Sequence, residues 1–140
     1  MTAGFQSAAG EQGRQFTEQC NTLLAGLGYE LHGPVRLHEV GVEIDQHATS
    51  PNGARVWFEY KGSIQGSRPG LRRTDTLKKA IANGALLAGV DERVPYVVLT
   101  SHLPVDGSGL AMMNTALRLG LVDDIICVYD PTQTGRLKTF

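Results

Sequence analysis

Apolar residues near the amino terminus recur with the spacing of a helix. Between about residues 11 and 25 they follow one another at intervals of three and four positions, which places them on one side of a helix. Gly26 and Gly28 interrupt this pattern and predict the end of the helix. The residues of the apolar side are Phe16, Cys20, Leu23, Leu24 and Leu27.

The next part of the chain alternates between apolar and polar residues, a pattern typical of half-buried strands. Strands are predicted over residues 29–37, 40–49 and 54–61. The second and third are separated by Ser50-Pro51-Asn52-Gly53, and Asn-Gly tolerates the positive φ angles of tight turns. These two strands therefore predict an antiparallel hairpin.

Helices and strands alternate in the second half of the chain. Helices are predicted over residues 74–88 and 109–119. Residues 96–100 form an almost continuous apolar run, as in a strand buried on both faces, and residues 124–129 predict the last strand. The predicted order is αβββαβαβ, with hairpins first and helical crossovers later. We therefore expect an α/β fold with a mixed central sheet flanked by helices.

Length and composition are those of one globular domain, residues 1–140, with 41% hydrophobic and 19% charged residues. Residues 1–10 predict a loose arm, and residues 131–140 predict a polar tail. No apolar run approaches the ~20 residues that span a bilayer, and the amino terminus does not resemble a secretory signal. Cys20 and Cys127 are interpreted as reduced core thiols, so we expect a cytoplasmic protein without a membrane partner.

Acidic residues and a lysine come together on the predicted hairpin. Glu59 and Lys61 lie two positions apart and share one face of the second hairpin strand, and Asp45 lies on the first. Glu43 shares the face of Asp45. Two carboxylates ~4 Å apart repel by roughly 4 kcal/mol at an effective dielectric constant of 20, and a divalent cation removes that repulsion. The hairpin therefore predicts a metal site.

Asp45 followed by Glu59-Tyr60-Lys61 resembles the D…(D/E)-x-K core of the PD-(D/E)XK nucleases, the restriction-endonuclease-like superfamily. In that family a helix carrying an acid often precedes the hairpin, as the predicted first helix does with Glu18. The resemblance implies the restriction-endonuclease-like version of the αβββαβαβ fold. It also implies that Asp45, Glu59 and the backbone carbonyl of Tyr60 bind Mg²⁺, with Mn²⁺ as a substitute, and that Glu18 is a further catalytic acid.

A bound divalent cation suits phosphodiester hydrolysis, because it lowers the pKa of its water and clamps phosphate oxygens. Lys61 would then orient the attacking water or stabilise the oxyanion as an ammonium, or act as a neutral base. We therefore expect a Mg²⁺-dependent DNA endonuclease. One centre cuts one strand, so cutting both strands requires a two-fold homodimer, or the chain is a subunit of a larger nucleic-acid-processing complex.

A basic segment begins where this metal site ends. The whole chain carries a net charge of −1, but positions 61–79 hold six of its thirteen Lys and Arg residues and one acid, a local charge of +5. Such a segment fits a groove that contacts DNA phosphates beside a cleavage centre. The expected phosphate-binding residues are Arg68, Arg72, Arg73, Lys78 and Lys79, and Gln65 and Glu43 are candidate accessory residues.

Three alternatives remain open at this stage. In the first alternative the chain is a non-catalytic nucleic-acid-binding or scaffold subunit on the same fold, and in the second it is an RNA-processing nuclease with the same site. In a third reading the hairpin only carries surface ion pairs of Glu43 and Asp45 with Arg55 and Lys61, worth ~0.2–1 kcal/mol each. Convergence of Asp45, Glu59 and Lys61 would favour the enzyme, whereas a Lys61 that points away would favour the binding subunit.

Overall fold

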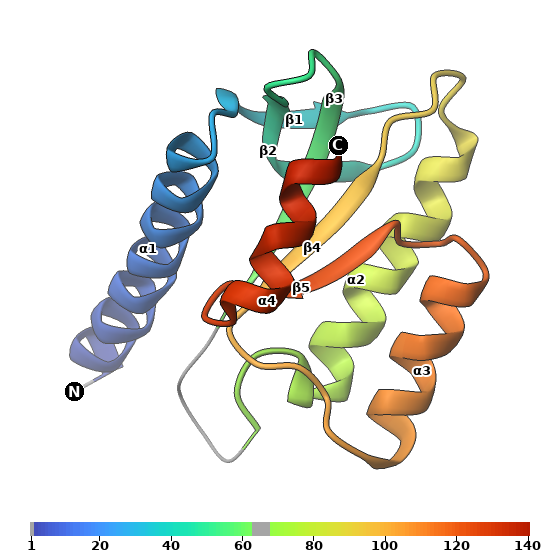
Figure 1. The fold of residues 1–140 in the computed structure, drawn as a ribbon. Coiled ribbons are helices and arrows are strands. Elements are labelled where there is room, and N and C mark those ends of the chain that lie inside the picture. Colours follow the sequence, from blue (N-terminus) through green and yellow to red (C-terminus); the bar gives the residue numbers. More distant parts are fainter. Residues whose placement is uncertain (1, 63–67) are drawn as a thin grey trace.

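The computed structural model describes residues 2–62 and 68–140, with the side chains described from residue 10 onward. A five-stranded sheet lies between two layers of helices (Figure 1). In chain order the elements are α1 (Thr2–Gly26), β1 (Glu30–Leu37), β2 (Val42–Thr49), β3 (Arg55–Lys61), the 3₁₀ turn η1 (Gly70–Arg72), α2 (Thr74–Leu86), η2 (Leu87–Gly89), β4 (Tyr96–Thr100), α3 (Gly107–Arg118), β5 (Asp124–Cys127), α4 (Pro131–Thr134) and η3 (Gly135–Thr139).

The strands follow one another across the sheet in their order along the chain. The pairs β1–β2 and β2–β3 are antiparallel, whereas β3–β4 and β4–β5 are parallel. Tight turns join the antiparallel strands, and the helices α2 and α3 make the crossovers between the parallel ones. The predicted α/β class with a mixed sheet and the predicted order αβββαβαβ are therefore confirmed.

Each face of the sheet carries its own apolar core. α1 and the carboxy-terminal segment α4–η3 cover one face, and α2 and α3 cover the other (Figure 1). Alternate residues of β3 and β4 serve the two cores, because successive side chains of a strand point to opposite faces. Phe58, Val97, Leu99, Ile126 and Leu137 belong to the core under α1, and Trp57, Leu77, Tyr96, Val98 and Ile125 to the core under α2 and α3.

The two ends of the chain differ from the expected loose arm and polar tail. The helix α1 begins at Thr2, so it includes most of residues 1–10. Residues 131–140 form α4 and η3, in which Leu137 is fully buried. Asp130 caps α4 by accepting a hydrogen bond from the Thr132 N–H, and the Tyr29 hydroxyl donates to the Leu137 carbonyl over 2.6 Å. The segment contains few apolar residues, so its polar sequence did not indicate this packing.

Candidate metal and phosphodiester site

The strands β2 and β3 bring Asp45, Glu59 and Lys61 together. The pairing of Gln46 with Phe58 brings Asp45 near Glu59 across the hairpin, and Glu59 lies on the side of the sheet that faces α2, where Asn83 donates to it. The Asp45 carboxyl lies close enough to Glu59 to raise the pKa of Glu59, and Lys61 Nζ lies 3.8 Å from Glu59 Oε1. Lys61 therefore points toward the acids, which is the arrangement expected for the enzyme.

A β-bulge in β2 sets the position of Asp45. Between His47 and Ile44 the chain of β2 advances by three residues while its partner β1 advances by two, so β2 contains an extra residue. At this bulge Asp45 Oδ2 accepts a hydrogen bond of 2.8 Å from the backbone N–H of Tyr60. The carboxylate thus takes the place that a strand carbonyl would occupy. Bulges commonly redirect a side chain beside a functional site.

Glu59 is buried, with 3% of its surface exposed. Its Oε2 accepts hydrogen bonds from Asn83 Nδ2 at 3.0 Å and from the Tyr96 hydroxyl at 2.9 Å. The pKa of Glu59 is raised from 4.5 to about 7, chiefly by burial and then by the hydrogen bond with Asp45 and the negative charge of Asp45, while Lys61 and Asn83 oppose the shift. At neutral pH Glu59 is therefore protonated in a large fraction of the molecules. A cation that binds Glu59 must displace this proton.

Tyr60 is held between the hairpin and α1. Its backbone N–H donates to Asp45, and its hydroxyl donates to Asn21 Oδ1 over 2.7 Å. Asn21 also accepts from Gln46 Nε2 at 3.1 Å, so α1 supports both strands of the hairpin. These contacts fix the peptide between Glu59 and Lys61, which carries the carbonyl predicted as a metal ligand.

The donor set suits Mg²⁺ better than a softer metal. Among the described residues, no group of three or more His, Cys, Asp and Glu side chains forms a metal cage. Asp45 and Glu59 would supply two hard carboxylate ligands, and the Tyr60 carbonyl would add a third oxygen. Mg²⁺ commonly binds through one or two carboxylates and keeps several waters, so this partial set fits it.

The end of β3 is held by the neighbouring strand β4 and by α1. The Thr100 hydroxyl of β4 donates to the Lys61 carbonyl over 2.7 Å. The next residue, Gly62, lies so close to the Phe16 ring of α1 that an added Cβ would overlap it. Lys61 itself keeps 25% of its side chain exposed. Its backbone is therefore anchored while its ammonium remains accessible.

The remaining predicted acids lie outside this group. Glu18 is exposed on α1 and lines a hollow of about 500 Å³ that also includes Tyr60 and Gly62. Glu43 is exposed, and its carboxylate lies 3.4 Å from Arg36 rather than beside Asp45. Gln65 lies outside the described residues.

None of the surface ion pairs considered as an alternative, those of Glu43 and Asp45 with Arg55 and Lys61, is found among the described residues. The Arg55 guanidinium donates to both carboxylate oxygens of Glu92 at 2.6 Å and contacts His47, not Glu43 or Asp45. The interpretation of Arg55 as a partner of these acids is therefore wrong. Lys61 lies in ion-pair distance of Glu59.

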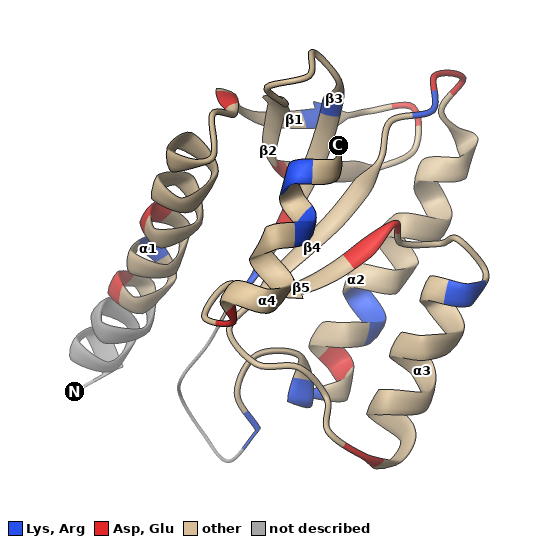
Figure 2. Ribbon diagram, viewed as in Figure 1, with Lys and Arg blue, Asp and Glu red and all other residues tan. Residues whose placement is uncertain are grey.

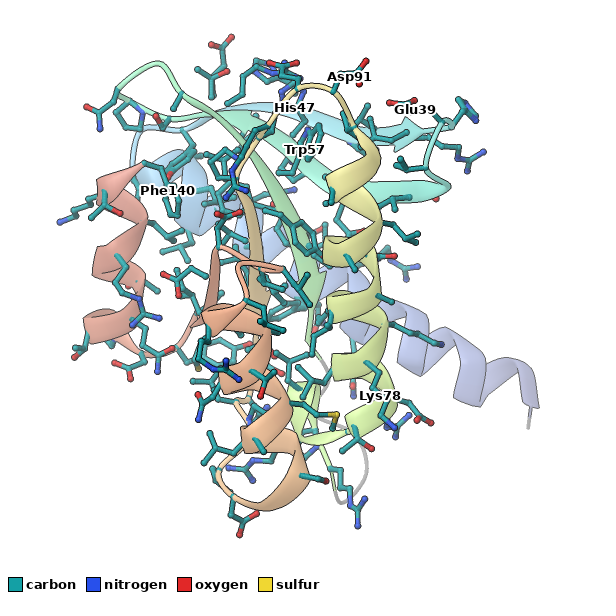
Figure 3. The ribbon with its side chains drawn as sticks, turned by 90° about the vertical axis from the view of Figure 1, so that its right-hand side faces the viewer. Glu39, His47, Trp57, Lys78, Asp91 and Phe140 are labelled. Atoms are coloured by element: carbon teal, nitrogen blue, oxygen red, sulfur yellow. The ribbon has the colours of Figure 1, made fainter. Side chains whose placement is uncertain are left out.

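The arginines of the basic segment line two cavities near the end of β3. Arg68 and Arg73 line a cavity beside Lys61, and Arg68 and Arg72 line an adjoining hollow of about 300 Å³ at the start of α3. Lys78 and Lys79 are exposed on α2 and follow Arg72 of η1 and Arg73 along the chain (Figure 2). Figure 3 shows Lys78 at the end of the molecule opposite to His47 and Trp57.

Two side chains of the site were not found from the sequence, Asn83 and Tyr96. Both contact Glu59 from other elements, α2 and β4. The available signal was an asparagine on a largely apolar helix and a tyrosine in a buried strand. Buried tyrosine hydroxyls usually need a hydrogen-bond partner, so Tyr96 indicated a polar group nearby without identifying it.

Comparisons of the chain with protein-family models, with curated proteins and with solved structures gave no match. In the described part of the chain, no helix has the length and apolar character needed to cross a membrane. A function for this chain therefore depends on the chemistry of the site itself.

Proposed function

We propose that this protein is a divalent-metal-dependent DNA endonuclease of the PD-(D/E)XK type. The observation that carries the proposal is the convergence of two carboxyl groups and a lysine from neighbouring strands, with Lys61 Nζ 3.8 Å from Glu59 Oε1. Burying Glu59 next to the carboxylate of Asp45 is unfavourable unless a proton or a cation is shared between them. Such a pair beside an accessible ammonium is an arrangement suited to metal-assisted hydrolysis.

Each residue of the group has a distinct role in this proposal. A Mg²⁺ ion bound by Asp45, Glu59 and the Tyr60 carbonyl would lower the pKa of a coordinated water and neutralise charge on the phosphate. Asn83 and Tyr96 occupy Glu59 Oε2, which leaves Oε1, on the side of Lys61, to face the ion. Lys61 then orients the attacking water or stabilises the charge that develops on the phosphate oxygens.

The arrangement of elements agrees with the same class of enzyme. A helix precedes a hairpin that carries the acids, and a mixed sheet lies between helical layers, as expected for the restriction-endonuclease-like fold. The arginines after β3 supply charge for phosphate contacts near the site. One such site cuts one strand, so a double-strand break would require a homodimer or a larger complex.

The test is cleavage of linear, supercoiled and branched DNA with Mg²⁺ or Mn²⁺. We expect nicking or cutting by the wild type, none by Asp45→Ala, and normal activity of Glu39→Ala, an exposed acid in the β1–β2 loop (Figure 3). An Asp45→Ala variant as active as the wild type would refute the site. DNA binding without cleavage in either metal would favour the non-catalytic subunit, and faster cleavage of RNA of the same sequence would favour the RNA-processing enzyme.

A further inference from the structure

A small cavity lies beside Lys61, between the end of β3 and the first turn of α2. Its volume is about 170 Å³. This corresponds to about five or six water molecules at ~30 Å³ each, which suits one phosphate group and is too small for a base pair. It adjoins the candidate metal site through Lys61. The side chains that line it are Tyr60, Lys61, Arg68, Arg73 and Thr76.

Positive charge collects in this cavity, and only Lys61 among its cations has a carboxylate of the described residues, Glu59, in ion-pair distance. Of the described residues that line it, Lys61, Arg68 and Arg73 are cationic and none is acidic. Within the described part of the chain, no carboxylate lies in ion-pair distance of either arginine. Three neighbouring cations repel one another, so an anion that enters is bound favourably. The Thr76 hydroxyl adds a neutral hydrogen-bond donor.

The wall that carries Arg73 is fixed by close backbone packing. Gly70 has a φ of +57°, and a Cβ there would lie 2.9 Å from the backbone nitrogen of His102. The Leu71 N–H donates to the His102 carbonyl over 3.0 Å, and the Leu71 side chain is fully buried. The turn η1 is thus attached to the loop after β4, so the start of α2 and Arg73 are held in place before any ligand binds.

We propose that this cavity is a phosphate subsite, which holds a backbone phosphate of the cleaved strand next to the phosphate at the metal. This inference rests on the proposed function, because it takes the cleaved strand as the ligand. Arg68 and Arg73 present planar guanidinium groups that match phosphate oxygens in pairs, and Lys61 contributes a third positive charge. Lys61 therefore lies between two neighbouring phosphates of one strand.

The direct test is a calorimetric titration of thymidine 3′,5′-bisphosphate into the metal-free protein in EDTA. We expect binding by the wild type, affinity about tenfold or more weaker for Arg73→Ala, and partial recovery for Arg73→Lys. Arg118→Ala is the matched control and should bind normally, since Arg118 is exposed at the end of α3, about 16 Å along that helix from its start. Absence of binding, or equal affinity of the wild type and Arg73→Ala, would overturn the subsite.

Cleavage kinetics separate this inference from the proposed function. For a DNA substrate, Arg73→Ala should raise KM about tenfold and leave the rate at saturation within about threefold, because it removes a binding contact. If the bisphosphate binds through Arg73 but the wild type cuts no DNA with Mg²⁺ or Mn²⁺, the subsite stands and the nuclease proposal fails. If the wild type cuts DNA while bisphosphate binding and KM are unaffected by Arg73→Ala, the nuclease stands and the subsite fails.

Discussion

Replacing Glu59 by glutamine should stabilise the metal-free protein at neutral and alkaline pH. A glutamine has the size of the protonated acid, its carbonyl oxygen accepts from Asn83 and Tyr96, and its N–H donates to Asp45. At high pH the wild type buries a carboxylate beside Asp45, whereas the variant buries a neutral amide. The variant is therefore relieved of the charge that burial disfavours.

The magnitude of this stabilisation follows from the pKa of Glu59, which folding raises from 4.5 to about 7. Between these two values the folded protein binds more protons than the unfolded chain, so stability falls as pH rises through this window. A shift of about 2.5 units at ~1.4 kcal/mol per unit corresponds to about 3 kcal/mol. This stability is present below about pH 4.5 and is lost above about pH 7. The free energy of unfolding of the Glu59→Gln variant does not fall in this way, because a glutamine does not ionise.

The assay is urea unfolding in EDTA at half-unit intervals from pH 5 to pH 8. The difference in free energy of unfolding between Glu59→Gln and the wild type should grow with pH by roughly 2–3 kcal/mol. Subtraction cancels the titration of unchanged groups, and Glu39→Gln, an exposed acid, should give a flat difference. A difference for Glu59→Gln that is constant within about 0.5 kcal/mol would refute a buried, proton-sharing Glu59.

Three further predictions concern the neighbouring residues. Lys61→Met should still bind DNA in Ca²⁺, with the loss of at most one phosphate contact, but cleave ~10²–10³ times more slowly in single-turnover reactions with Mg²⁺, and a rate within threefold of the wild type would contradict a chemical role. Arg72→Ala combined with Arg73→Ala should reduce the salt slope of log K for duplex DNA by up to ~1.8, and an unchanged slope would mean that neither contacts phosphate. Gly62→Ala should lower the free energy of unfolding by ~1–3 kcal/mol in urea melts, because the new methyl group overlaps the Phe16 ring, and an unchanged midpoint would contradict that packing.

The strands and the central acids of the site could be predicted because they depend on local sequence. A turn signal four residues long sets the hairpin register, and period-two alternation then assigns side chains to faces. That was enough to bring Asp45, Glu59 and Lys61 to one place. The same reasoning placed Glu43 beside Asp45, yet Glu43 is exposed and paired with Arg36. The bulge in β2 interrupts strict alternation, and no residue near Asp45 indicated it.

The surroundings of the acids depend on contacts between distant parts of the chain. Asn83 and Tyr96 reach Glu59 across 24 and 37 positions, so their meeting requires the packing of α2 and β4 on the hairpin. The carboxy-terminal segment is similar, because Leu137 receives a hydrogen bond from Tyr29 across 108 positions. Local periodicity contains no information about such partners, whereas the burial of Tyr96 and Leu137 follows once the layers are assembled.

The Tyr96 hydroxyl connects the charge of the site to the backbone of a helix. It lies 2.9 Å from Glu59 Oε2 and 3.1 Å from the Ala80 carbonyl in α2, but it carries a single hydrogen. Glu59 Oε2 and the Ala80 carbonyl therefore compete for one hydrogen, and an ionised Glu59 attracts it more strongly than a neutral one. The charge on Glu59 therefore affects how this hydroxyl is shared with the backbone of α2 at its second turn. A single tyrosine side chain thus links the protonation of the acid pair to the backbone of the helix that follows Arg73.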